Sequence, residues 1–171
     1  MAAKLNRAKA HKTKEQIDEI FKCANDVNYF ATKYAYIPHP LEGLIKFKPF
    51  PYQLEALKNF QENRFVIVNK SRQLGFSTVT MVYSLWLALF HRNKNIVSIA
   101  TKSSIAQNYI TRLRQSLTKI PDWLFITEFD SNSKKEISFT NGSRIQAVPT
   151  SESAARGDSL SVLVLDECID G

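Results

Sequence analysis

The chain has 171 residues, of which 44% are hydrophobic, with only 5 glycines and 6 prolines. This composition excludes a disordered tail or a fibre, and the length suits one globular domain with its own apolar core. No apolar run is long enough to cross a bilayer, so we expect a soluble protein inside the cell.

The N-terminus concentrates positive charge. The first fourteen residues contain no acid, and their five cations supply most of the net charge of +7: Lys4, Arg7, Lys9, Lys12 and Lys14. A basic arm of this kind can neutralise phosphates, which favours nucleic acid as a partner. A solvated terminus that only aids solubility fits the same residues equally well.

Apolar periodicity predicts helices and strands along the whole chain. A helix at 15–34 and a proline-rich connector at 36–51 come first. The further elements are helix 52–63, strand 65–69, helix 77–91, strand 95–101, helix 104–120, paired strands 136–140 and 143–148 around Asn141-Gly142, and strand 161–165. Short strands of continuous apolar residues that alternate with helices predict an α/β fold with a parallel sheet, and the Asn-Gly turn adds an antiparallel hairpin.

The segment after the strand at 65–69 has the strand–loop–helix order of a phosphate-binding loop. It reads Lys70-Ser71-Arg72-Gln73-Leu74-Gly75-Phe76-Ser77-Thr78. Backbone N–H groups and the start of the helix would face the anion, Gly75 would allow close approach, and Ser77 would offer Mg²⁺ a hydroxyl. The pattern G-x-x-x-x-G-K-[ST] fails twice, because Lys70 replaces its first glycine and Phe76 its lysine. A tight connection with two solvent-facing cations remains the alternative.

The last predicted strand ends in Asp166 and Glu167. A carboxylate at this position can hold Mg²⁺ through its water shell, and an adjacent Glu can orient and deprotonate an attacking water. Acidic pairs also end strands simply by entering solvent. However, the pair and the loop both follow predicted parallel strands, whose carboxyl ends form the ligand-binding edge of open α/β sheets. Together they favour a site for ATP and Mg²⁺.

These segments resemble the ATPase domain of the large terminase subunit of tailed bacteriophages, a P-loop NTPase of the ASCE or RecA-like type. The resemblance covers residues 47–171 and rests on the loop, the acidic pair and three further segments: Pro51-Tyr52-Gln53, Ile99 to Ser103, and Ala155-Arg156-Gly157. It implies a parallel sheet flanked by helices, with the antiparallel hairpin and an N-terminal helical extension added to it.

The resemblance also implies how the loop would bind the nucleotide. Its backbone amides would hold the phosphates, and Lys70 would bring an ammonium to the β- and γ-phosphates in place of the missing lysine. Arg72 would sense or stabilise the γ-phosphate. Mg²⁺ would be held by Ser77 directly and by Asp166 through water.

Three residues outside the loop acquire roles in the same way. Glu167 would align the lytic water, and Arg156 would reach the ATP of a neighbouring subunit as an arginine finger. Gln53 would read adenine through its amide. Arg156 could instead pair with Asp158 or Glu152, and Gln53 could be an ordinary solvent-facing helix residue.

The family's activity gives the functional hypothesis. A terminase motor hydrolyses ATP to move double-stranded viral DNA into a procapsid in the host cytoplasm. The implied partners are DNA, the portal protein, the small terminase subunit and further copies in a ring, with no membrane. We divide the chain into a basic arm, helix and connector at 1–46 and a partial P-loop ATPase domain at 47–171. The family's lid and nuclease domains would follow, so we expect an N-terminal fragment or a truncated product.

Two other functions stay open. A helicase-like DNA translocase would share the glutamine segment and the Asp-Glu pair, although such proteins normally keep the loop lysine. A catalytically inactive fragment could instead bind DNA through the basic arm, or bind the intact motor.

Overall fold

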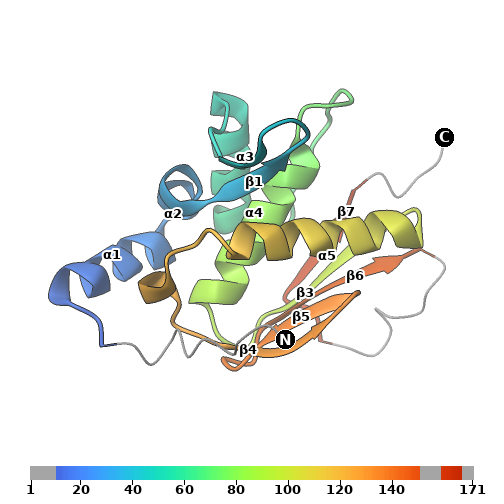
Figure 1. Ribbon diagram of the computed structural model, residues 1–171. Coiled ribbons are helices and arrows are strands. Elements are labelled where there is room, and N and C mark those ends of the chain that lie inside the picture. Colours follow the sequence, from blue (N-terminus) through green and yellow to red (C-terminus); the bar gives the residue numbers. More distant parts are fainter. Residues whose placement is uncertain (1–10, 151–158, 167–171) are drawn as a thin grey trace.

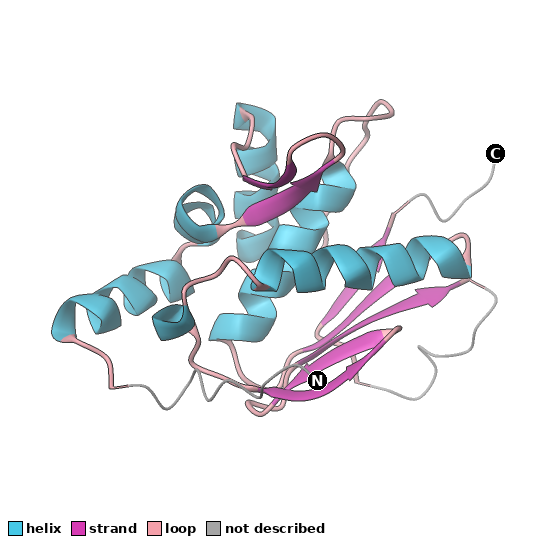
Figure 2. Ribbon diagram, viewed as in Figure 1, coloured by secondary structure: helices cyan, strands magenta, loops and turns pink. Residues whose placement is uncertain are grey.

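The computed structural model describes residues 11–150 and 159–166, and these form a mixed α/β fold (Figure 1 and Figure 2). The elements are α1 (Lys14–Asn25), α2 (Val27–Tyr34), β1 (Tyr36–His39), β2 (Gly43–Lys46), α3 (Pro51–Glu62), α4 (Phe76–Phe90), β3 (Asn95–Ala100), α5 (Ser103–Leu117), a 3₁₀ turn (Asp122–Leu124), β4 (Phe129–Ser133), β5 (Glu136–Phe139), β6 (Arg144–Pro149) and β7 (Val162–Leu165). None of the described helices is long and apolar enough to span a membrane.

Five strands form one mixed sheet in the order β4-β5-β6-β3-β7. The central strand β3 runs parallel to β6 and to β7, with Ile96 opposite Ile145 on one side and Val162 on the other. The β4-β5 and β5-β6 pairs are antiparallel. The prediction is therefore confirmed in part: β3 lies parallel to β6 and β7, and β5 and β6 form the antiparallel hairpin around Asn141-Gly142. β4 is a strand that the sequence analysis did not predict.

Helix α4 is the most buried element of the described chain. Eleven of its 15 residues are buried, as its nearly continuous apolar sequence requires. The Trp86 indole donates to the Cys23 carbonyl at 2.7 Å, which ties α4 to α1. On another side, the hydroxyls of Ser84 and Tyr109 hydrogen-bond at 3.1 Å, which ties α4 to α5. These contacts fix the position of the helix that follows the candidate phosphate loop.

The predicted helix at 15–34 is in fact two helices, because Asp26 interrupts it. Asp26 has an extended backbone (φ −137°, ψ 108°), and its carboxylate accepts hydrogen bonds from the N–H groups of Asn28 and Tyr29. An aspartate that caps a new helix in this way ends the previous one. The apolar spacing continues across Asp26, which is why periodicity alone predicted one helix.

The predicted connector at 36–51 contains a regular hairpin. Strands β1 and β2 pair antiparallel, with Ile37 opposite Ile45. Gly43 adopts a left-handed backbone (φ +74°) at the start of β2, a conformation that glycine tolerates without a steric cost. Proline is compatible with an edge strand, so Pro38 within β1 did not exclude one.

The prediction of a buried strand at 65–69 is wrong. No described residue pairs with this segment in a sheet. Phe65 is 83% exposed and Ile67 is 99% exposed. Bare apolar sequence favours an extended backbone, but a strand also requires a neighbouring strand with which to pair. The last strand, β7, is confirmed, although its alternate residues Leu163 and Leu165 are exposed rather than buried.

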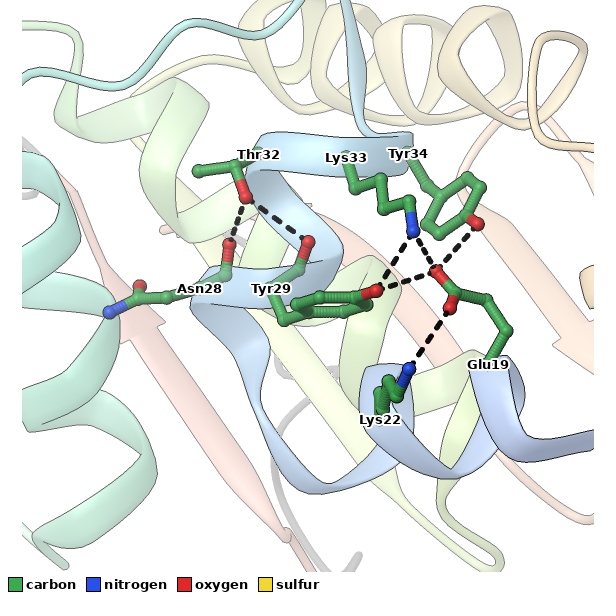
Figure 3. A network of polar contacts seen from close by, with 7 residues as sticks. All are labelled: Glu19, Lys22, Asn28, Tyr29, Thr32, Lys33 and Tyr34. Atoms are coloured by element: carbon green, nitrogen blue, oxygen red, sulfur yellow. Dashed lines mark hydrogen bonds and ion pairs between the residues drawn. The ribbon is translucent and has the colours of Figure 1, made fainter.

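A polar cluster joins α1 to α2 across the break at Asp26 (Figure 3). Glu19 accepts hydrogen bonds from the ammonium of Lys33 and, at 2.8 Å each, from the hydroxyls of Tyr29 and Tyr34. Its other oxygen lies 3.8 Å from the Lys22 ammonium. The bond from Lys33 is the main cause that lowers the pKa of Glu19 to about 2. The ionised carboxylate therefore stabilises the folded arrangement of the two helices.

We expect Glu19→Gln to reduce stability at neutral pH and to make stability less sensitive to acid. The unfolded carboxyl titrates near pH 4.3, whereas the folded one titrates near 2. Its stabilisation is therefore complete above the unfolded pKa and is lost as pH falls through the folded pKa. Melting temperatures measured by circular dichroism should differ most above about pH 5 and should converge as pH falls to about 2.

Glu62→Gln provides the matched control, because the contact that Glu62 makes among residues 11–150 and 159–166 is an exposed pair with Lys58 at 3.9 Å. Exposed pairs contribute little, so this variant should follow the wild-type profile. A gap between wild type and Glu19→Gln that is the same at every pH would contradict the assignment.

Candidate functional site

Two parts of the chain that lie 89 residues apart meet at Asp166. The Ser77 hydroxyl donates a hydrogen bond to one carboxylate oxygen, and the Lys70 ammonium lies 3.5 Å from the other. The side chains of Lys70 and Asp166 are about one-fifth exposed, at 22% and 20%. The loop cation, the loop hydroxyl and the strand-end carboxylate therefore form one cluster.

The loop that leads into α4 has a sharply turned backbone. Gln73 and Gly75 both have left-handed backbones, with φ values of +63° and +72°. Gly75 is the N-cap of α4 and supplies no side-chain cap. Among the described residues, none accepts a hydrogen bond from the N–H groups of Gly75, Phe76 and Ser77. Unsatisfied N–H groups at a helix start can bind an anion, so these donors fit a phosphate group.

Gln53 holds the loop from the side of α3. Its amide nitrogen donates to the Leu74 carbonyl at 3.0 Å, and its amide oxygen accepts from the Phe50 N–H at 3.0 Å. The Tyr52 hydroxyl donates to the same Leu74 carbonyl at 3.2 Å. Gln53 is 5% exposed, so it is not the solvent-facing glutamine of the alternative interpretation. Its contacts position the loop, while contact with adenine stays a prediction.

Phe76 occupies the position of the usual loop lysine and joins a row of aromatic rings. Its ring stacks on Tyr52 with centroids 6.2 Å apart, and Tyr52 stacks on Phe50 at 5.6 Å and an interplanar angle of 6°. The contact with Tyr52 places Phe76 beside the loop, next to the residue that bonds Leu74.

A cavity of about 530 Å³ opens next to the loop. Gln53, Gly75 and Thr78 line it from α3 and the start of α4. Its other walls come from the β1–β2 hairpin and the segment after it: Ile37, Glu42, Ile45, Lys46, Phe47, Lys48 and Phe50. This size lies within the range of small-molecule sites. The hairpin, which was predicted as an irregular connector, thus forms a wall of the cavity beside the loop.

The remaining predicted residues are less constrained. Ser71, Arg72 and Gln73 are exposed at the turn of the loop, and no described residue forms an ion pair with Arg72. Glu167 and Arg156 lie outside the described residues, so their roles stay predictions. The same holds for residues 1–10 of the basic arm.

Arg112 on α5 belongs to this region and was missed by the sequence analysis. Its guanidinium donates a hydrogen bond to the Thr78 hydroxyl at 2.7 Å. Burial lowers the pKa of this guanidinium. The sequence signal was an arginine one turn after Tyr109 on the apolar face of α5. The apolar periodicity identifies the face of α5 on which Arg112 lies, but it does not identify Thr78 as the residue that Arg112 contacts.

The fold and the site define a class of protein. This is an α/β protein whose candidate site joins a helix-start loop, a lysine and a strand-end carboxylate. Residues 67–170 match the family model described as terminase large subunit, T4likevirus-type, N-terminal. The match covers more than half of the 171 residues, so the chain belongs to this terminase family. The resemblance noted in the sequence is confirmed, and the family is one in which the N-terminal region of the large subunit is an ATPase.

Gly75→Ala tests the contact between the loop and α3. An alanine at φ +72° is strained, and its Cβ would lie 2.8 Å from the Gln53 amide nitrogen. We expect a loss of stability of about 1–3 kcal/mol from backbone strain, with a further loss from displacement of Gln53. Urea unfolding followed by tryptophan fluorescence measures both contributions.

Gly43→Ala is the matched control, because Gly43 has φ +74° but no atom within 4 Å of the added Cβ. Gly75→Ala should cost more than Gly43→Ala in the wild type. In a Gln53→Ala background the two costs should become similar. Equal costs in the wild type would show that Gln53 does not hold the loop as described.

Proposed function

We propose that this chain is the ATP-binding part of a DNA-packaging motor that hydrolyses ATP to translocate double-stranded viral DNA into a procapsid. The observation that carries the proposal is the meeting of Lys70 and Ser77 with Asp166. A family match alone would not require these residues to be close, and a chance strand ending in an acid would not meet the loop. The mixed sheet and the loop–helix start support a P-loop NTPase fold.

The residues present fit a divalent cation and a triphosphate. Ser77 and Asp166 offer adjacent oxygen ligands, which is the donor type that Mg²⁺ prefers. Mg²⁺ held there would neutralise charge on the β- and γ-phosphates. The unsatisfied N–H groups of the loop would donate to phosphate oxygens. Glu167 would orient the attacking water, and Arg72 and Arg156 would stabilise charge on the γ-phosphate.

Lys70 would exchange partners when the nucleotide binds. In the structure its ammonium neutralises Asp166. Once a cation occupies the carboxylate, the ammonium can turn to a phosphate on its flexible four-carbon stem. Lys70 would thereby supply the charge that Phe76 cannot.

Partners and assembly belong to the same proposal. Double-stranded DNA, the portal protein, the small terminase subunit and a ring of identical subunits are the partners of such a motor, acting in the host cytoplasm. The basic residues at the N-terminus would contribute attraction to DNA phosphates.

Lys70→Ala should weaken binding of Mg·ATP by about tenfold or more, because a hydrogen bond to a charged group contributes about 1.5–3 kcal/mol. Isothermal titration calorimetry measures the affinity, and release of phosphate measures hydrolysis where turnover occurs. Lys58→Ala is the control, because Lys58 is an exposed lysine on α3. If Lys70→Ala and Lys58→Ala bind Mg·ATP equally well, Lys70 does not replace the missing lysine.

Asp166→Asn should separate the effects of metal and nucleotide. The variant loses the carboxylate that pairs with Lys70, which removes one attraction that competes with phosphate for the ammonium when no metal is present. We therefore expect metal-free ATP to bind more tightly than it does to wild type, whereas adding Mg²⁺ should increase affinity much less. Calorimetry gives the affinity of wild type and of Asp166→Asn for ATP, each measured once with EDTA and once with Mg²⁺. A variant that keeps the full wild-type increase on adding Mg²⁺ would exclude Asp166 as a metal ligand.

A further inference from the structure

Arg112 is a charged residue that the proposed mechanism does not use. It lies half-buried on α5, and no described carboxylate is within ion-pair distance of it. The only hydrogen bond recorded for its guanidinium within the described chain is the 2.7 Å bond to the Thr78 hydroxyl. A partly buried cation usually has an anionic partner. Its position beside the first turn of α4 makes a bound anion the natural partner.

The contact determines which way the Thr78 hydroxyl can act. A guanidinium can only donate hydrogen bonds, so the Thr78 oxygen must be the acceptor. The hydroxyl proton is then left to donate to another group. No described residue accepts it.

Other threonines inside the described helices behave differently. Thr32, Thr80 and Thr111 each donate to a backbone carbonyl three or four residues earlier. The equivalent carbonyls for Thr78 are those of Leu74, which accepts from Gln53 and Tyr52, and of Gly75, which accepts from the backbone N–H groups of Thr78 and Val79. Thr78 instead makes its side-chain contact with α5.

Thr78 also lies where a phosphate group would bind. It is the third residue of α4 and lines the 530 Å³ cavity together with Gly75 and Gln53. The start of a helix favours negative charge. A hydroxyl that accepts a bond from a cation is polarised and becomes a stronger donor.

We propose that Arg112 is a positioning residue for the nucleotide phosphates: it holds Thr78 with its hydroxyl proton free to donate to a phosphate oxygen. The inference rests on the proposed function, because it assigns a residue to the same phosphate site. It adds α5 to the elements that shape the site.

A double-mutant cycle on binding tests the proposal. The variants are Arg112→Met, which keeps the length and removes the charge, and Thr78→Val, which keeps the shape and removes the hydroxyl. The probes are Mg·ATP and inorganic tripolyphosphate, and calorimetry gives each affinity. We expect either variant to bind both probes about tenfold more weakly, the gain of one charge-assisted hydrogen bond. The double variant should be little weaker than either single one.

Conservative variants separate this role from a purely structural one. Arg112→Lys and Thr78→Ser keep a cationic donor and a hydroxyl, so they should retain most of the affinity. Arg92→Met removes the same charge from an exposed site at the other end of α4 and should bind as wild type does. If Arg112→Met does not fold, the comparison of Thr78→Val with Thr78→Ser decides, because both changes are small.

The outcomes distinguish this inference from the proposed function. Wild-type binding that depends on Lys70, together with unchanged affinity in Arg112→Met or Thr78→Val, overturns this inference alone. Losses that simply add in the double variant also overturn it. A wild-type chain that binds neither Mg·ATP nor tripolyphosphate overturns the proposed function, and this inference with it.

Discussion

The contact of Asp166 with Ser77 and Lys70 is the interaction on which the candidate site depends. It joins the end of β7 to the start of α4, 89 residues apart in the chain. A carboxylate that is about one-fifth exposed must have its charge compensated. The cation and hydroxyl that compensate it are also the groups that a metal and a triphosphate would require. In the structure the three side chains compensate one another, and the same side chains could exchange these contacts for a metal ion and a triphosphate.

Helix α4 carries this arrangement into the rest of the molecule. Because it is buried on nearly every side, its first turn is held by neighbours rather than by a capping side chain. Gln53 and Tyr52 hold the preceding carbonyl from α3, and Arg112 holds Thr78 from α5. Because these polar contacts hold the loop from two sides, its N-cap can be glycine, which offers no capping side chain. The N–H groups at the helix start are then left for another acceptor. The Phe76 ring fits this environment because it stacks on Tyr52 at the end of an aromatic row.

Local sequence signals predicted most elements, and they failed where a partner decides the outcome. The periodicity of α4 and α5 and the Asn141-Gly142 turn between β5 and β6 depend on neighbours in sequence, so those predictions are confirmed. The apolar segment at 65–69 has the composition of a buried strand but no strand beside it. The helix break at Asp26 was missed because a single capping carboxylate outweighed a continuous apolar spacing. The hairpin that lines the cavity was missed because its prolines and glycine also suit an irregular connector.

The sequence by itself determined the chemistry available to this terminase chain. The order of the loop residues, the carboxylate after an apolar strand and the absence of the usual lysine can all be identified without a structure, because motifs record which groups must be near one another. Only the tertiary structure decided that Lys70 and Ser77 share Asp166, that Gln53 serves the loop, and that Arg112 reaches Thr78. Those contacts join residues on different elements, and their distances are set by how helices and strands pack rather than by spacing along the chain.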